Sequence, residues 1–146
     1  MDAQYETDFV AWTEHQAELL RARRAELEPF GLDIENLLDE VETLGRTVKR
    51  ELQSRLTRLL EHLLKWQYQP QRRGKSWRIT VSNQREGIED LLNESPSLRH
   101  MLDAVLKDRY RLARERAARA TESNPDTFPA DCPWTVAQVL DPNFWP

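Results

Sequence analysis

The chain has 146 residues, of which 39% are hydrophobic and 32% are charged, with a formal net charge of -4. This length suits one domain with its own core, and a content of only 4 glycines favours helices over a sheet. The acidic balance argues against a general nucleic-acid coat, and the single cysteine, Cys132, excludes an intramolecular disulfide and a cysteine metal cluster.

The sequence also carries no signal for a membrane. No stretch approaches the ~18 to 20 apolar residues that a membrane span needs, and the acidic start lacks the apolar segment of a signal peptide. We therefore predict a cytoplasmic protein without membrane contact, made of one helical domain over residues 1–146.

The first predicted helix covers the N-terminal segment. Apolar residues recur at helical spacing from Tyr5 to about Leu27. Pro29 and Gly31 then end the helix, because proline disfavours a helical residue before it and glycine readily adopts the left-handed turn. Asp33 offers an N-cap oxygen to the next helix.

The longest helical pattern runs from Asp33 to about Gln69 and breaks at Pro70. A straight helix of this length would measure roughly 55 Å, whereas a compact domain of this size has a radius of gyration of about 15 Å. We therefore predict a kink near Gly45, with a second subunit that covers the excess as the alternative. The second half should form the buried centre of the bundle. One face carries the apolar side chains, namely Ile34, Leu37, Val41, Leu44, Val48, Leu52, Leu59, Leu63 and Trp66.

Two further helices and a tail complete the expected fold. A third helix is predicted to start after an N-cap at Ser76, and a fourth after the Ser95–Pro96 pair. The segment 122–146 holds five of the 8 prolines but is too apolar to be a disordered linker. We expect it to pack back on the bundle, with a short helix over 135–140. The predicted fold is an all-α bundle of about four main helices plus a short C-terminal helix.

Seven segments, in order and spacing, resemble the bacterial family called domain of unknown function number twenty-nine. The resemblance spans nearly the whole chain and implies an all-helical bacterial protein without an assigned activity, and it supplies no catalytic motif. The segments are Tyr5 with Asp8 and Trp12; DIENLLDEVETLG; HLLKWQYQP; SWR at 76–78; Gln84 with Arg85; SPSL at 95–98; and FPADCPWT with the closing FWP.

A polar stripe on the long helix is the first candidate site. Imidazole and carboxylate groups bind divalent metals and transfer protons, so Glu51 and His62 could serve a metal-dependent or acid/base enzyme. Eleven residues separate them, about three turns, which is too far for both to hold one ion. The competing interpretation is a polar network that fixes helix register. The candidate polar cluster consists of Glu40, Glu51, Arg55, His62 and Arg85.

A basic segment over 65–85 is the second candidate. It combines positive charge with Trp66, Tyr68 and Trp77, the combination that single-strand binders use. The competing interpretation places the tryptophans in the core and the arginines in a solvated loop. The candidate binding residues are Lys65, Arg72, Arg73, Lys75 and Arg78.

A non-enzymatic module demands the fewest assumptions, because the sequence lacks a glycine-rich phosphate loop, a Ser/His/Asp constellation and paired cysteine ligands. We therefore predict a protein-interaction or oligomerisation module with a protein partner or a second copy of itself. The enzyme and nucleic-acid alternatives stay open, and we assign no metal ligands and no cofactor.

Overall fold

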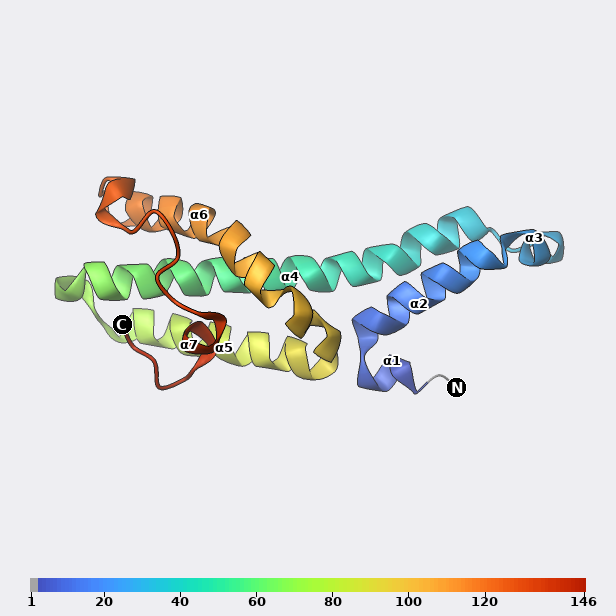
Figure 1. Cartoon of the computed structure of the whole chain (residues 1–146), viewed down its shortest axis with the longest axis horizontal. Coiled ribbons are helices and arrows are strands. Elements are labelled where there is room, and N and C mark those ends of the chain that lie inside the picture. The colour runs from blue at the N-terminus through green and yellow to red at the C-terminus, as the bar shows by residue number, and fades with distance from the viewer. Residues whose placement is uncertain (1–2) are drawn as a thin grey trace. The chain divides into compact units, whose positions relative to one another are not determined.

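A computed structural model describes residues 3–146, so the first two residues of the predicted domain lie outside the described residues. All of the regular elements in this range are helical, which confirms the all-α prediction (Figure 1). In chain order they are α1 (Gln4–Thr7), α2 (Phe9–Ala22), α3 (Arg24–Leu27), η1 (Glu28–Phe30), α4 (Ile34–Tyr68), η2 (Pro70–Arg72), α5 (Lys75–Glu94), η3 (Pro96–Met101), α6 (Leu102–Ala120), η4 (Pro125–Thr127) and α7 (Val136–Leu140), where η marks a 3-10 helix.

The chain divides into two compact units. The first contains residues up to Glu51 together with Leu91–Arg99, and the second contains Leu52–Asp90 together with His100–Pro146. The predicted single domain over 1–146 stays a prediction. Among residues 3–146, no helix has both the length and the apolarity that crossing a bilayer requires.

The N-terminal segment forms three helices rather than one, so the continuous helix predicted from Tyr5 to Leu27 is wrong. Asp8 adopts an extended backbone and its carboxylate accepts the N–H of Ala11 at 3.0 Å, which makes it the N-cap of α2. The same carboxylate accepts the N–H and the hydroxyl of Ser97, both at 2.8 Å. An aspartate that caps one helix and binds a distant segment interrupts a pattern that is periodic on both sides.

Helix α4 is one unbroken helix of 35 residues. Asp33 accepts the N–H of Asn36 at 3.2 Å, as predicted for its N-cap, and the helix continues through Gly45 and ends at Tyr68. The kink at Gly45 stays a prediction. The prediction that the second half is buried is confirmed, because six leucines are at most 2% exposed: Leu52, Leu56, Leu59, Leu60, Leu63 and Leu64.

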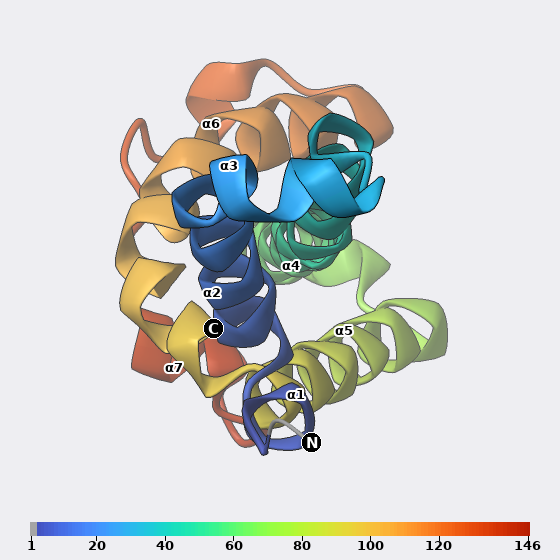
Figure 2. The same cartoon turned by 90° about the vertical axis from the view of Figure 1, so that its right-hand side faces the viewer.

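In the second unit, the C-terminal half of α4 lies between α5 and α6 (Figures 1 and 2). The helical assignment of α5 is confirmed, but Ser76 is not its N-cap, because α5 begins at Lys75. The fourth main helix also begins later than predicted. A 3-10 turn follows Pro96, and α6 starts at Leu102. In the first unit, the hydroxyl of Ser95 accepts the N–H of Val10 at 3.1 Å instead of capping α6.

The C-terminal tail packs against the helices of the second unit. Phe128 and Trp134 are buried, and Val139 of α7 is fully buried. Thr135 caps α7 through a capping box with Gln138, in which each side chain accepts a backbone N–H of the other residue. The tail therefore supplies part of the core of this unit.

Candidate functional site

The predicted polar cluster is distributed over both units. Glu40 and Glu51 are exposed and belong to the first unit, whereas Arg55, His62 and Arg85 belong to the second. Along α4, the eleven residues between Glu51 and His62 correspond to about 16 Å at 1.5 Å per residue. Arg55 donates to the side-chain oxygen of Gln84 at 3.3 Å. The cluster as a functional unit stays a prediction, and each member has its own surroundings.

Arg85 fastens the C-terminal tail. The side chain is 6% exposed, and its Nε donates to the carbonyl oxygen of Val139 at 2.9 Å. Its Nη atoms donate to the carbonyl oxygens of Phe144 at 2.8 Å and Pro142 at 3.5 Å. The guanidinium also lies over the ring of Trp145, 5.4 Å from its centroid. Burial lowers the pKa of Arg85, and the carbonyl dipoles compensate for the lost water.

His62 and Lys65 form a buried polar group on α4. Nδ1 of His62 lies 2.9 Å from the carbonyl oxygen of Arg58, so this nitrogen carries the proton. Nε2 is then the acceptor, 3.4 Å from Nζ of Lys65. Lys65 also pairs with Glu61 at 3.6 Å, and its ammonium lies 5.2 Å from the centroid of the Trp77 ring. Burial lowers the pKa of both His62 and Lys65.

This arrangement bears on the predicted metal chemistry. An ammonium group at Nε2 takes the lone pair that a metal ion would need, and it repels a divalent cation. Across residues 3–146, no group of three or more His, Cys, Asp or Glu side chains is placed to hold a metal. Both ring nitrogens of His62 contact residues of α4 itself, so the register-fixing network stays a prediction.

Most of the predicted basic rim gathers at the junction between α4 and α5. Arg73 and Arg78 place their guanidinium groups 5.2 Å and 5.4 Å from the ring centroid of Trp66. Lys75 and Gly74 complete the lining of an open cavity of about 450 Å³. Lys65 is buried away from this rim, and Arg72 lies in η2 outside the lining.

A cavity of about 720 Å³ between α6 and the tail was missed by sequence reasoning. The hydroxyl of Tyr110 donates to the carbonyl oxygen of Pro129 at 2.6 Å beside it, and Cys132 contributes to the wall. Burial raises the pKa of both Tyr110 and Cys132, which keeps the phenol and the thiol protonated. The walls of this cavity come from α6 and the tail, which meet only through tertiary packing. The aromatic content of the tail is therefore the only sequence signal that could have indicated the cavity.

The first unit contains a hairpin formed by α2 and the N-terminal half of α4. Lys49 pairs with Glu14 at 2.9 Å and Arg21 pairs with Glu42, so the two helices run antiparallel. The two helices approach closely where Gly45 of α4 meets Thr13 of α2, because glycine has no side chain there. A Cβ atom at Gly45 would lie only 2.6 Å from the hydroxyl oxygen of Thr13.

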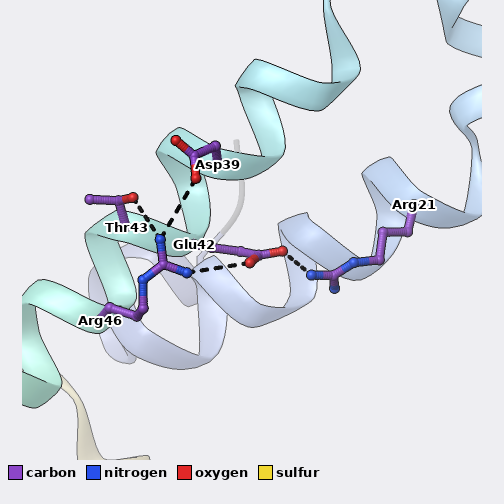
Figure 3. A network of polar contacts seen from close by, with 5 residues as sticks. All are labelled: Arg21, Asp39, Glu42, Thr43 and Arg46. Atoms are coloured by element: carbon purple, nitrogen blue, oxygen red, sulfur yellow. Dashed lines mark hydrogen bonds and ion pairs between the residues drawn. The ribbon is translucent and has the colours of Figure 1, made fainter.

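One side of this hairpin is a polar groove. It is lined by charged side chains of both helices, among them Glu14, Glu18, Arg21, Glu42, Arg46 and Lys49. Figure 3 shows part of the network, in which Arg46 contacts Asp39 and Glu42 of α4 and donates to Thr43 at 2.9 Å. Both arginines and the lysine on this side therefore already have carboxylate partners within the chain.

The opposite side of the hairpin is apolar and partly exposed. Leu37 and Leu44 of α4 are 39% and 47% exposed. Near the start of α2, the rings of Tyr5, Phe9 and Trp12 contact one another at centroid distances of 4.8 to 5.8 Å, and Tyr5 is 49% exposed. We call the side formed by Phe9, Trp12, Leu20, Leu37, Val41, Leu44 and Val48 the apolar face.

These observations define an all-helical protein with an amphipathic hairpin and a tail-fastened helical core. The chain belongs to the family described as Domain of unknown function DUF29, whose family model matches residues 4–145. Comparisons with curated proteins and with solved structures found no match.

Proposed function

We propose that the chain is an interaction module, in a bacterial cytoplasm, that forms a homodimer through the apolar face of the α2–α4 hairpin. The observation that carries this proposal is the exposure of Leu37 and Leu44 in the N-terminal half of α4, whose opposite flank is charged and paired with α2. A surface helix with one apolar flank normally buries that flank against another element.

Helical geometry supports one continuous face. At about 100° of rotation per residue, Leu37, Leu44 and Val48 lie about 60° to 100° around the α4 axis from Gly45. Glu42, Arg46 and Lys49 lie on the other side of Gly45. On α2, Phe9 and Leu20 lie about 60° to 80° from Ala17, opposite to Glu14 and Arg21. Because the polar flanks share one groove, the apolar flanks share the other side.

The face is small. With a rise of 1.5 Å per residue, the eleven steps from Leu37 to Val48 and from Phe9 to Leu20 each span about 17 Å, and two helices about 10 Å in diameter give a width of about 20 Å. Two copies would cover about 700 Å² in total, which lies below the range of stable interfaces, so we expect a weak dimer that dissociates on dilution.

A second copy is also the occupant that the chemistry fits. A twofold axis brings identical faces together, and two antiparallel hairpins then complete a four-helix bundle. The centre of the face carries no charge, whereas the exposed Glu40 and Glu51 fall at its edge, as in interfaces with an apolar core and a polar rim.

The other two functions have weaker support. A metal-dependent or acid/base enzyme that uses Glu51 and His62 would require Lys65 to move away from Nε2 of His62. Nucleic-acid binding through the segment 65–85 would use a basic area that stands out in a chain of net charge -4. Neither hypothesis accounts for the apolar face.

Substitution of Leu44 tests the proposal. Leu44→Glu places a charge at the centre of the face, and we expect it to convert a dimer to a monomer in light scattering. Ile79→Glu is the matched control, because Ile79 is 48% exposed but lies on α5 in the other unit. A dimer that survives Leu44→Glu, or one that Ile79→Glu disrupts equally, would contradict the assignment of the face.

A further inference from the structure

The basic cavity at the start of α5 has a composition that differs from the rest of the chain. Its lining joins Trp66 of α4 to Arg73, Gly74, Lys75 and Arg78, and its volume is about 450 Å³. Trp66 is 7% exposed, whereas the three cationic residues are exposed. A buried indole thus forms the base of a cavity with cationic walls.

Among the described residues, no Asp or Glu side chain pairs with the positive charges in this cavity. No acidic residue occurs from His62 through Arg85, and within residues 3–146 no ion pair is formed by Arg73, Lys75 or Arg78. Elsewhere arginines do find carboxylates, as Arg21 and Arg46 do with Glu42. Like charges repel at close range, so their gathering at one place calls for an anion to offset them.

The arginine side chains are oriented by the indole. Each guanidinium lies over the Trp66 ring, which holds it in place by a cation–π interaction. Nε of Arg73 donates to the carbonyl oxygen of Trp66 at 2.7 Å, and one Nη atom lies 3.5 Å from a main-chain oxygen of Pro146, the last described residue. The remaining N–H groups of the Arg73 guanidinium are available to a ligand.

Two further donor groups are unused by the described residues. Within residues 3–146, no hydrogen bond is formed by the side chains of Arg78 and Lys75. The first backbone N–H groups of α5, a helix of 20 residues, have no acceptor inside the helix and add positive potential at the same point. Arginine forks, an ammonium group and helix N–H groups are the donors that bind phosphate oxygens.

We propose that this cavity binds the phosphate group of a small phosphorylated ligand. The charges are confined to one cavity whose volume lies within the range of small-molecule sites, and they do not extend as a track along the chain. A small ligand with two or more phosphate charges fits such a site better than a polynucleotide, because the net charge of -4 repels a long polyanion.

Calorimetric titration of the full chain at low salt with inorganic pyrophosphate tests the proposal. We expect binding that Arg78→Gln weakens about tenfold to a hundredfold, because a charge-assisted hydrogen bond is lost. Arg116→Gln is the matched control, since it removes the same charge from an exposed position of α6 outside the cavity, and it should change the affinity by no more than about twofold.

A second titration separates the sources of the phosphate. A single-stranded oligonucleotide is added with and without a 5′-phosphate. We expect pyrophosphate to compete with the oligonucleotide that carries the 5′-phosphate and not with the one that lacks it. Absence of pyrophosphate binding at low salt, or equal weakening by Arg78→Gln and Arg116→Gln, would overturn the site. If the oligonucleotide binds equally tightly with and without its 5′-phosphate, the cavity is assigned to nucleic acid and the small-ligand proposal is overturned.

Discussion

Replacement of Arg85 by methionine should release the C-terminal tail. Methionine keeps the apolar stem of the side chain but removes all of its donors. Arg85 makes two hydrogen bonds shorter than 3 Å to the carbonyl oxygens of Val139 and Phe144. Bonds to a charged group contribute about 1.5 to 3 kcal/mol each. Because the Phe144 residue is only half-buried and its carbonyl can regain water, we expect a loss of about 2 to 4 kcal/mol.

Urea unfolding followed by tryptophan fluorescence measures this loss, and hydrogen exchange over 136–145 locates it. Arg85→Lys keeps the charge but reaches fewer carbonyls, so its stability should fall between those of Arg85→Met and the unchanged chain. Arg116→Met, at an exposed position, is the control and should cost less than about 0.5 kcal/mol. An Arg85→Met chain as stable as the control, with unchanged exchange in the tail, would refute the role of Arg85.

Two further substitutions test residues of α4, namely Gly45 through its packing against α2 and His62 through its effect on the pH dependence of stability. Gly45→Ala should destabilise the first unit, because a Cβ atom there lies 2.6 Å from the hydroxyl of Thr13, and overpacking of about 1 to 3 kcal/mol exceeds the gain of up to ~1 kcal/mol in helix propensity. Urea unfolding decides this, and a more stable Gly45→Ala chain would contradict the close crossing. Burial lowers the pKa of His62 below its ordinary value, so the unfolded chain binds the extra proton first and stability decreases as pH falls below about 6.5, by at most about 1.4 kcal/mol per pH unit. His62→Gln should remove this part of the pH dependence of urea unfolding, and identical profiles for both proteins would contradict it.

The helices with strong local signals could be predicted from the sequence. The N-cap oxygen of Asp33 and the break at Pro70 set the limits of α4, and Thr135 sets the start of α7. The interruption at Asp8 could not be predicted, because the carboxylate also binds Ser97, 89 residues away in the sequence. Local periodicity contains no information about such a partner.

The candidate site was predictable in composition but not in arrangement. The basic character of Arg73, Lys75 and Arg78 is visible in the sequence, whereas their position around Trp66 depends on how α4 meets α5. Lys65 belongs to the same basic segment, yet helical geometry directs it to Glu61 and His62 on its own helix. The role of Arg85 depends on a tail that returns 54 to 59 residues later.

The central claim is that the apolar face of the hairpin joins two copies of the chain. Light scattering of the unmodified protein over a dilution series tests it most directly, because dimerisation depends on concentration. We expect a mass that approaches twice that of one chain at high concentration and falls on dilution. A mass equal to one chain at every concentration would contradict it.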